Sequence, residues 1–463
     1  GMRRRLAAVL VLDVVAYTRH VAEDAEATLA WLRVAFREVV RPTVRRTGGR
    51  IVKLTGDGAV VEFTSALAAL RAAVEIQRTL RGVPADGRRI EVRAGAHLGD
   101  VFDDGGDVFG DTVNLAARLE GMAEPGGIAV SAALRTTVGA AGGVAFVDQG
   151  LCSLKNVAEP VHVFAVDLDE ERPDDPYAAF AASQVVRFCR ARDGTRIAFS
   201  HVGEGPPLIK AANWLNHLEL DWTNPLFRHK IASLAREHRF YRYDGRGNGL
   251  SDWEVDDISF EAFVDDLAAV FDAAGLARAP LLGISQGCAV AVAFAVRHPE
   301  RVSALVLRGG FPQGRERRPS AHDRDRAQAL QAMMRTSFEG DELSFRELLA
   351  GQLAPSAGAE ERRVIARHMR LATNAENMVR IRRAVDAIDV TDLLAQVRAP
   401  TLVLHARGDR MQPLAQGRLL AAGIPDAEFV VVESDNHVLL EHDPATAHAD
   451  AEIGRFLARH ADR

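Results

Sequence analysis

The hydrophobic pattern of the first third of the chain predicts alternating strands and helices. Residues 6–12 form an unbroken apolar run, which predicts a buried strand. Residues 24–46 place apolar side chains at helical spacing and end at a glycine pair. Two short strand patterns, 50–54 and 59–63, flank a glycine-rich turn, which predicts a hairpin.

The pattern continues with a helix over residues 66–80 and a strand over 90–98. Strand, helix, hairpin, helix and strand in this order are typical of a ferredoxin-like α+β domain. A helix near 114–122 and a strand over 161–166 extend it. We predict that this domain spans residues 2–166.

The second half of the chain has the pattern of an α/β domain. From about residue 185, strand-like runs such as 304–307 and 401–404 alternate with helices, which predicts a parallel sheet covered on both faces over 185–463. The stretch 314–389 is charged and helical without a buried-strand pattern, which predicts an inserted helical lid. An acidic segment with two prolines predicts a linker over residues 167–184.

Composition agrees with two soluble domains. The chain has 463 residues, of which 48% are hydrophobic and 26% are charged. A net charge of -6 argues against a nucleic-acid partner. Three distant cysteines predict neither disulfides nor a zinc site and favour the cytoplasm. No apolar run is long enough to span a membrane. The arginines at 3–5 and the apolar run 6–12 together resemble a signal peptide, but no cleavage site follows them.

Polar residues in the first domain are suited to phosphoryl transfer. Asp13 ends the first predicted strand, and Asp57 lies at the tip of the hairpin. These strands are neighbours in a ferredoxin-like sheet, so the two carboxylates can converge on Mg²⁺ or Mn²⁺. Asn114 and Arg118 would project from one helix face, where Asn114 can hold a ribose and Arg118 can contact a transferring phosphoryl group. The alternative for these residues is a turn former or a solvated helix face.

Four segments carry a resemblance to a known family. They are Leu-Asp-Val-Val-Ala-Tyr at 12–17, Val-Lys-Leu-Thr-Gly-Asp-Gly at 52–58, the stretch 107–120 and Leu-Lys-Asn-Val at 154–157. Together they resemble the class III adenylyl cyclase catalytic domain over about residues 5–166. The resemblance implies that Asp13 and Asp57 bind two metal ions, that Lys53 and Asp107 read adenine, that Asn114 orients the ribose, that Arg118 stabilises the transition state and that Lys155 contacts the triphosphate.

The choice of ATP over GTP also has a physical basis. A carboxylate can accept a hydrogen bond from the adenine 6-amino group while a lysine donates to a ring nitrogen, and guanine presents the opposite pattern. Guanylyl members of the family carry glutamate where Lys53 stands. The resemblance further implies a head-to-tail homodimer with two shared sites.

One position departs from the family pattern. Ala16 stands where many relatives have glycine, and its methyl group would crowd the phosphates if the backbone there needs a positive φ. The backbone amides of residues 14–18 lead into a helix and are candidates to cradle phosphate oxygens.

A separate set of residues in the second domain predicts a serine hydrolase site. Ser285 lies in Gly-Ile-Ser-Gln-Gly between a predicted strand and a predicted helix, the context of a nucleophile elbow. Asp409 and His437 each follow a later strand, and the order Ser, Asp, His resembles the α/β-hydrolase fold over about residues 185–460. His437 would take the proton of Ser285, and Asp409 would orient His437. Asp435 is a competing acid, but it is poorly placed two residues before His437.

The oxyanion hole and the substrate of this second site are less defined by the sequence. The amide of Gln286 and an amide near Asn213 or Trp214 would form the oxyanion hole. A serine nucleophile favours hydrolysis of an ester, thioester or lactone. Three functions stay open: an adenylyl cyclase whose hydrolase-like domain senses a small molecule, a carboxylesterase or lactonase with a weak cyclase domain, and a non-enzymatic switch that binds ligands at both sites.

Overall fold

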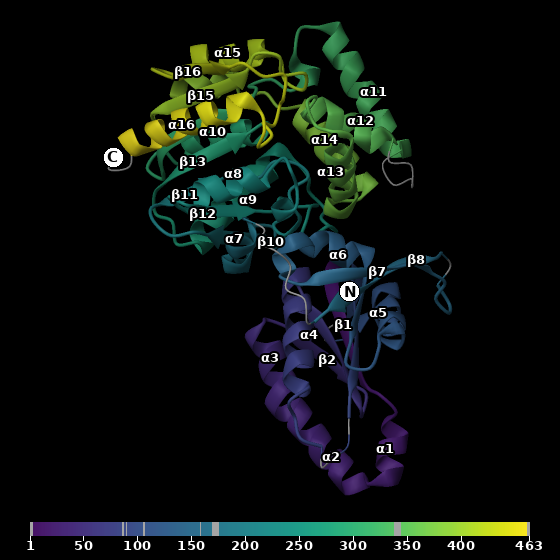
Figure 1. Ribbon diagram of the computed structural model, residues 1–463. Coiled ribbons are helices and arrows are strands. Elements are labelled where there is room, and N and C mark those ends of the chain that lie inside the picture. Colours follow the sequence, from purple (N-terminus) through teal and green to yellow (C-terminus); the bar gives the residue numbers. More distant parts are fainter. Residues whose placement is uncertain are drawn as a thin grey trace. The chain divides into compact units, whose positions relative to one another are not determined.

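The computed structural model describes residues 3–85, 88, 90–104, 107–157, 159–168, 176–337 and 344–460. The chain forms two compact units, Gly1–Ala179 and Phe180–Arg463 (Figure 1). The division falls within the predicted linker, of which residues 169–175 lie outside the described ranges.

In the sheet of the first unit, β1 (Arg3–Val14) is an interior strand. It is flanked antiparallel by β3 (Gly58–Phe63) and β4 (Val92–Asp104), and β2 (Arg50–Leu54) lies beyond β3. The order β2-β3-β1-β4 is that of the predicted ferredoxin-like domain. Beyond β4 the sheet continues with β6, β8 and β7, and β5 pairs with β4. Their bounds are Asp107–Phe109 (β5), Ile128–Ser131 (β6), Ala145–Cys152 (β7) and Val161–Asp167 (β8).

Helices cover both faces of this sheet, which explains why β1 has no polar side. Ala8, Leu10 and Leu12 pack in one core with α4, whereas Ala7, Val9 and Val11 pack in another with Ala116 of α5. The helices are α1 (Tyr17–Glu23), α2 (Ala25–Val34), the π-helical η1 (Ala35–Val40), α3 (Arg41–Arg46), α4 (Ala66–Leu80), α5 (Asp111–Met122), α6 (Ala132–Val138) and η2 (Gly139–Gly142).

The prediction missed two strands and a helix between residues 128 and 152. Strand β6 has only four residues, and it runs directly into α6. Strand β7 has no buried residue and contains a polar bulge, so it has no apolar alternation to detect.

The second unit contains an eight-stranded sheet in the order β16-β15-β14-β13-β11-β12-β10-β9. Strands β11 to β16 pair in parallel, as predicted, while β9 and β10 form an antiparallel edge. Their bounds are Val185–Arg190 (β9), Arg196–Val202 (β10), Pro207–Lys210 (β11), Arg239–Tyr243 (β12), Ala279–Ile284 (β13), Val302–Arg308 (β14), Thr401–Ala406 (β15) and Glu428–Val432 (β16).

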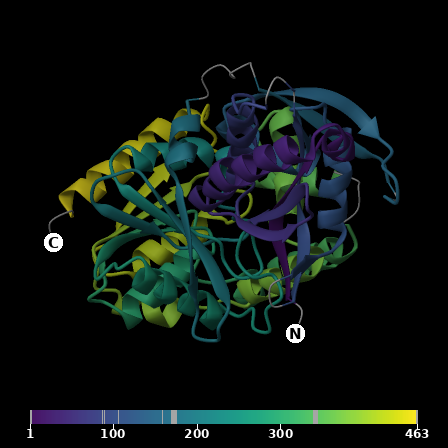
Figure 2. The same ribbon diagram turned by 90° about the horizontal axis from the view of Figure 1, so that it is seen from below.

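Helices flank this second sheet. Phe271 of α9 stacks on Phe294 of α10 with ring centroids 4.7 Å apart. Helix α16, at the C-terminal end of the chain, packs against β15 and β16 (Figure 2). The helices are α7 (Ala178–Ser183), η3 (Leu220–Trp222), α8 (Arg228–Ala235), α9 (Phe260–Ala273), α10 (Gly287–Arg297), η5 (Thr391–Gln396), α15 (Leu414–Gly423) and α16 (Pro444–Arg459). No helix in the described ranges combines the length and hydropathy of a bilayer span.

The predicted lid is a helical insertion between β14 and β15. It contains η4 (Arg315–Arg317), α11 (Ala321–Ser337), α12 (Ser344–Leu353), α13 (Ala359–Ala372) and α14 (Ala375–Asp386). Its two ends meet in a narrow neck, where Gln313 and Asp389 form an isolated antiparallel bridge and the Gly314 amide donates to the Ile388 carbonyl at 2.8 Å. The insertion therefore leaves the sheet and returns to it at one point.

Candidate functional sites in the two units

In the first unit, the fold brings Asp13 and Asp57 together. Asp13 lies opposite Gly58 in the β1–β3 ladder, and the Val14 amide donates to the Asp57 carbonyl at 3.2 Å. Burial raises the pKa of Asp13 and the nearby charge of Asp57 raises it further, although the Val14 amide and Arg93 oppose both effects. The two carboxylates thus repel one another in a partly buried place, where an oxygen-seeking divalent cation would be stabilised.

The glycines beside Asp57 permit this close approach. Gly56 has a φ of +95°, in the region that glycine adopts without strain. A Cβ atom on Gly58 would lie 2.3 Å from the Leu12 carbonyl oxygen and 3.1 Å from Oδ1 of Asp13. Any side chain at position 58 would therefore push the hairpin away from β1.

A third carboxylate near this pair was not found from the sequence. Burial and the charges of Asp13 and Asp57 together raise the pKa of Glu120 to about 7, against the opposing effect of Arg93. Glu120 approaches β1 because α5 packs directly on the backbone of β4, where a Cβ on Gly95 would lie 2.0 Å from the Glu120 nitrogen. The sequence shows Glu120 in the last turn of the predicted helix but does not show how close that helix lies to the sheet.

The predicted nucleotide-binding residues are spread over several elements of the first unit. The side chains of Lys53, Asn114, Arg118 and Lys155 are exposed and form no hydrogen bond or ion pair in the described part of the chain. Asn114 and Arg118 lie one turn apart on α5, as the spacing predicts. Asp107 begins β5, and its side chain lies outside the part that the structure describes.

The backbone around Ala16 has the conformation that the sequence analysis considered. Ala16 has φ 53° and ψ 36° and is the N-cap residue of α1. The amide of Val14 donates to Asp57, and that of Val15 donates to the Glu91 carbonyl at 2.9 Å. These two amides are therefore not available to phosphate, contrary to the sequence-based expectation. Of the five backbone amides of residues 14–18, those of Tyr17 and Thr18 lie in the first turn of α1, where amides have no hydrogen-bond partner within the helix.

We expect Ala16→Gly to stabilise the first unit by about 1 kcal/mol, because glycine adopts a left-handed conformation without the strain of a Cβ atom. Chemical denaturation measures this change. The matched control is Ala30→Gly, an exposed position inside α2, where glycine should destabilise by a similar amount. If both variants are destabilised alike, Ala16 is not in a left-handed conformation.

In the second unit, Ser285 has the geometry of a nucleophile elbow. It has a φ of 54° at the sharp turn between β13 and α10, and its amide donates to the Arg308 carbonyl at 3.0 Å. A Cβ on Gly283 would lie 2.7 Å from the Cα of Cys288, so the turn requires glycine there. This strained turn directs the serine side chain out of the sheet at the start of a helix.

Asp409 holds His437 beside this serine. His437 Nδ1 lies 2.7 Å from Asp409 Oδ2, and Asp409 Oδ1 accepts from the amides of Met411 at 2.8 Å and Gln412 at 2.9 Å. Burial would raise the pKa of Asp409, but the charge and hydrogen bond of His437 and the Gln412 amide lower it more, so the pKa is below its ordinary value. Asp409 is therefore ionised at neutral pH, as the orienting acid of a triad must be. Asp435 is exposed and has no hydrogen bond to His437.

One of the two proposed oxyanion donors near residue 213 is already occupied. The Asn213 amide donates to Asn216 Oδ1 at 2.8 Å. The Trp214 amide is then the candidate partner of the Gln286 amide, which lies at the positive end of α10. The sequence left this choice open because it depends on the local hydrogen bonding of the loop.

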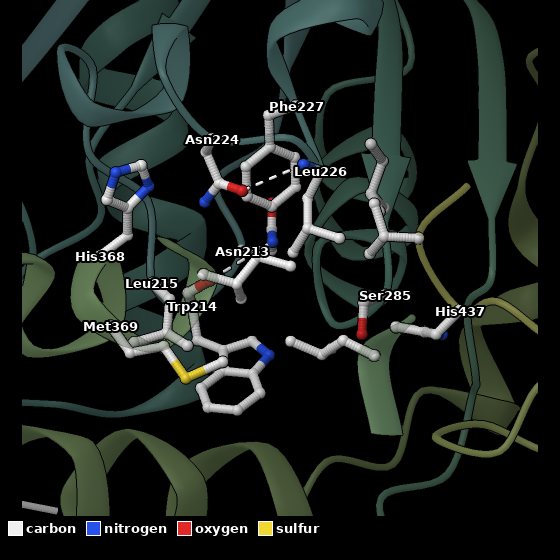
Figure 3. Close-up of a pocket in the computed structure, with 14 residues that line it drawn as sticks. Asn213, Trp214, Leu215, Asn224, Leu226, Phe227, Ser285, His368, Met369 and His437 are labelled. Carbon is white, nitrogen blue, oxygen red and sulfur yellow. Dashed lines mark hydrogen bonds between the residues drawn. The ribbon is translucent and has the colours of Figure 1, made fainter. Parts of the chain in front are cut away.

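Ser285 and His437 share a small apolar pocket beneath the lid. In Figure 3 the Ser285 hydroxyl lies beside His437 at one end, and His368 and Met369 lie at the other. The cavity measures about 30 Å³, room for roughly two water molecules. A substrate therefore needs the lid or the lining side chains to move. The lining residues are Asn213, Trp214, Leu215, Asn224, Leu226, Phe227, Ile284, Ser285, Leu353, Ile365, His368, Met369, His437 and Val438.

Charged residues in β12 and in the loop that follows it brace the fold rather than the pocket. Arg242 forms a buried ion pair with Asp221 at 2.7 Å. Arg246 binds both oxygens of Asp266 at 2.9 and 2.7 Å and also binds Asp193. None of these residues lines the pocket beside Ser285.

Comparison with known proteins identifies both units. Residues 5–166 match the family of adenylate and guanylate cyclase catalytic domains, and residues 220–444 match the α/β hydrolase fold family. The protein joins a class III nucleotidyl cyclase domain to an α/β-hydrolase domain. This confirms the family and the fold predicted for each half of the sequence.

Two of the relatives each match one domain. The cyclase domain is similar to a Rhizobium meliloti protein named "Putative adenylate cyclase 3", with 39% identity over 183 residues that cover 39% of this chain and 31% of that protein. The chain thus spans less than a third of that relative. The hydrolase domain is similar to the AB hydrolase superfamily protein YisY of Bacillus subtilis, with 26% identity over 253 residues that cover 54% of this chain and 91% of the relative.

A solved structure supports the fold of the hydrolase domain. An esterase from Exiguobacterium antarcticum aligns with a TM-score of 0.51 and 20% identity, covering 60% of this chain and all of the esterase. At this identity the likeness concerns the fold alone.

Proposed function

We propose that the cyclase domain converts ATP to 3′,5′-cyclic AMP and pyrophosphate. The 3′-oxygen of the ribose attacks the α-phosphorus, the bond from that phosphorus to the bridging oxygen breaks, and pyrophosphate leaves while the hydroxyl proton passes to water. The observation that carries the proposal is the convergence of Asp13 and Asp57 at the hairpin, where the charge of Asp57 raises the pKa of Asp13.

The residues of the chain fit two divalent ions, Mg²⁺ or Mn²⁺. Asp13 and Asp57 would hold them. The ions would neutralise the negative charge of the triphosphate and the charge that develops in the transition state. Lys53 and Asp107 would select adenine, Asn114 would orient the ribose, Lys155 would bind the triphosphate, and Arg118 would stabilise the transition state.

We further propose that the active form is a head-to-tail homodimer. Within one chain no hydrogen bond or ion pair of the described residues joins Arg118 or Asn114 to the aspartate pair, so a second chain would supply them. Large apolar side chains of the cyclase domain are exposed: Leu54 is 47% exposed, Met122 40% and Leu151 72%. Burial of these side chains would favour association of two cyclase domains.

The test is an assay of purified protein with ATP or GTP and Mn²⁺. We expect cyclic AMP and pyrophosphate in equal amounts from ATP, little product from GTP, and no product from Asp57→Ala. Glu26→Ala, which removes an exposed carboxylate on α2, should keep the wild-type rate. Equal activity of Asp57→Ala and wild type would refute the metal assignment.

A second candidate function is serine hydrolysis in the other domain. The observation that favours it is the His437–Asp409 hydrogen bond beside a strained Ser285. The apolar pocket lining suits the acyl or alcohol part of a small ester, thioester or lactone. If the triad does not act, the same enclosed pocket would serve to bind a small apolar ligand and sense it for the cyclase.

A further inference from the structure

A second cavity in the hydrolase domain lies at the neck of the lid. Its volume is about 470 Å³, which is within the range of pockets that hold small molecules. It is separate from the pocket beside Ser285, with which it shares no lining residue. Its lining consists of Arg315, Arg318, Asp323, Arg326, Gln352, Asp409, Arg410, Met411 and Pro413.

The lining of this cavity carries an excess of positive charge. Four arginines face two aspartates, a difference of two positive charges. One of the aspartates, Asp409, is already bound to His437 and to two amides. The other, Asp323, lies 4.0 Å from Arg318. Among the residues that line the cavity, positive charge therefore exceeds negative charge.

One buried guanidinium has an atom without a hydrogen-bond partner. Arg315 is buried, and its Nη1 forms no hydrogen bond; the nearest carboxylate oxygen, on Asp386, is 3.9 Å away. Asp386 is instead held by Arg382 at 2.7 Å and by Gln331 at 3.1 Å. Burial and the neighbouring charges of Arg382, Arg318 and Arg326 together lower the pKa of Arg315 to about 9, against the opposing effect of Asp386.

We propose that this cavity binds a small multivalent oxyanion, such as a phosphate-bearing or polycarboxylate molecule. Arg315 and Arg318 form its inner wall, and the exposed Arg326 and Arg410 form its mouth. Guanidinium groups present paired donors that match carboxylate and phosphate oxygens, and a buried unpaired donor is stabilised when an anion reaches it.

The site is built against the loop that carries the triad acid. Arg315 Nη2 donates to the Met411 carbonyl at 3.2 Å, and Arg318 donates to the side chain of Gln412. The amides of the same two residues hold Asp409. A bound anion would therefore contact the arginines that fix the lid neck to this loop.

The test is calorimetric titration of the full chain with pyrophosphate, inorganic phosphate and citrate in metal-free buffer of low ionic strength. The site variant is Arg326→Gln/Arg410→Gln, because both residues are exposed and their removal should not affect folding. The matched control is Arg335→Gln/Arg418→Gln, two exposed arginines outside the cavity. The cyclase site is unchanged in both, so a difference between them reports on the cavity.

We expect the site variant to bind the anions about tenfold more weakly than the wild-type chain does, or to lose one class of anion-binding sites, because two charge-assisted contacts are removed. The control should bind as wild type does. Tighter binding of pyrophosphate than of citrate would identify a phosphate ligand, and the reverse a carboxylate ligand. Equal binding by both variants, or no binding by the wild-type chain, would overturn the proposal.

Discussion

Chains with Asp57→Ala and chains with Arg118→Ala should each make no cyclic AMP, while an equimolar mixture of the two should recover about a quarter of the wild-type rate. Each single variant removes one half of both shared sites, a loss of about a thousandfold or more. In the mixture, half of the dimers are mixed, and each mixed dimer keeps one intact site of two. Cyclic AMP formation against mixing ratio measures this recovery.

The mixture is informative only if the variants still associate, so the dimer is measured by light scattering on the same samples. A mixture that stays inactive although both chains dimerise would show that one chain does not complete the site of another. Full activity of Arg118→Ala alone would exclude this arginine from the transition state.

Ser285→Ala should lower the hydrolysis of a nitrophenyl ester by about a thousandfold or more, because the triad loses its nucleophile. The cyclase rate of the same variant should not fall, since its nucleotide and metal residues are untouched. Ester hydrolysis and cyclic AMP formation are measured on one preparation. Ser183→Ala, an exposed serine of α7, serves as the control and should keep both rates.

Two outcomes would change the interpretation of the hydrolase domain. If Ser285→Ala hydrolyses the ester as fast as wild type, the pocket beside His437 is not the esterase site. If the wild-type chain is itself inactive toward small esters, the enclosed pocket is better explained as a binding site for a sensed ligand.

The sequence predicted most of the fold where burial leaves a strong pattern. Strand β1 was found because it is apolar on both faces, and its pairing with β3 followed from the ferredoxin-like order, which also predicted that Asp13 and Asp57 meet. Strand β7 was missed because none of its residues is buried and it therefore has no hydrophobic period.

Details that depend on distances between elements could not be predicted. The position of Glu120 near Asp13 depends on the contact of α5 with Gly95. The Asn213 amide is excluded as an oxyanion donor because it donates a hydrogen bond to Asn216 of the same loop. The arginine cavity joins residues 315–326 to residue 410, and only the folded lid brings them together. The roles of Lys53, Asn114, Arg118 and Lys155 stay predictions until activity is measured.

The central claim is that Asp13 and Asp57 together bind two divalent ions beside the nucleotide. Its most direct test is to count bound Mn²⁺ by electron paramagnetic resonance with 3′-deoxy-ATP, which lacks the attacking hydroxyl. The wild-type chain should bind two ions per nucleotide site, and Asp13→Asn/Asp57→Asn should bind none beyond those that the free nucleotide holds. Equal Mn²⁺ binding by the two proteins would contradict the account.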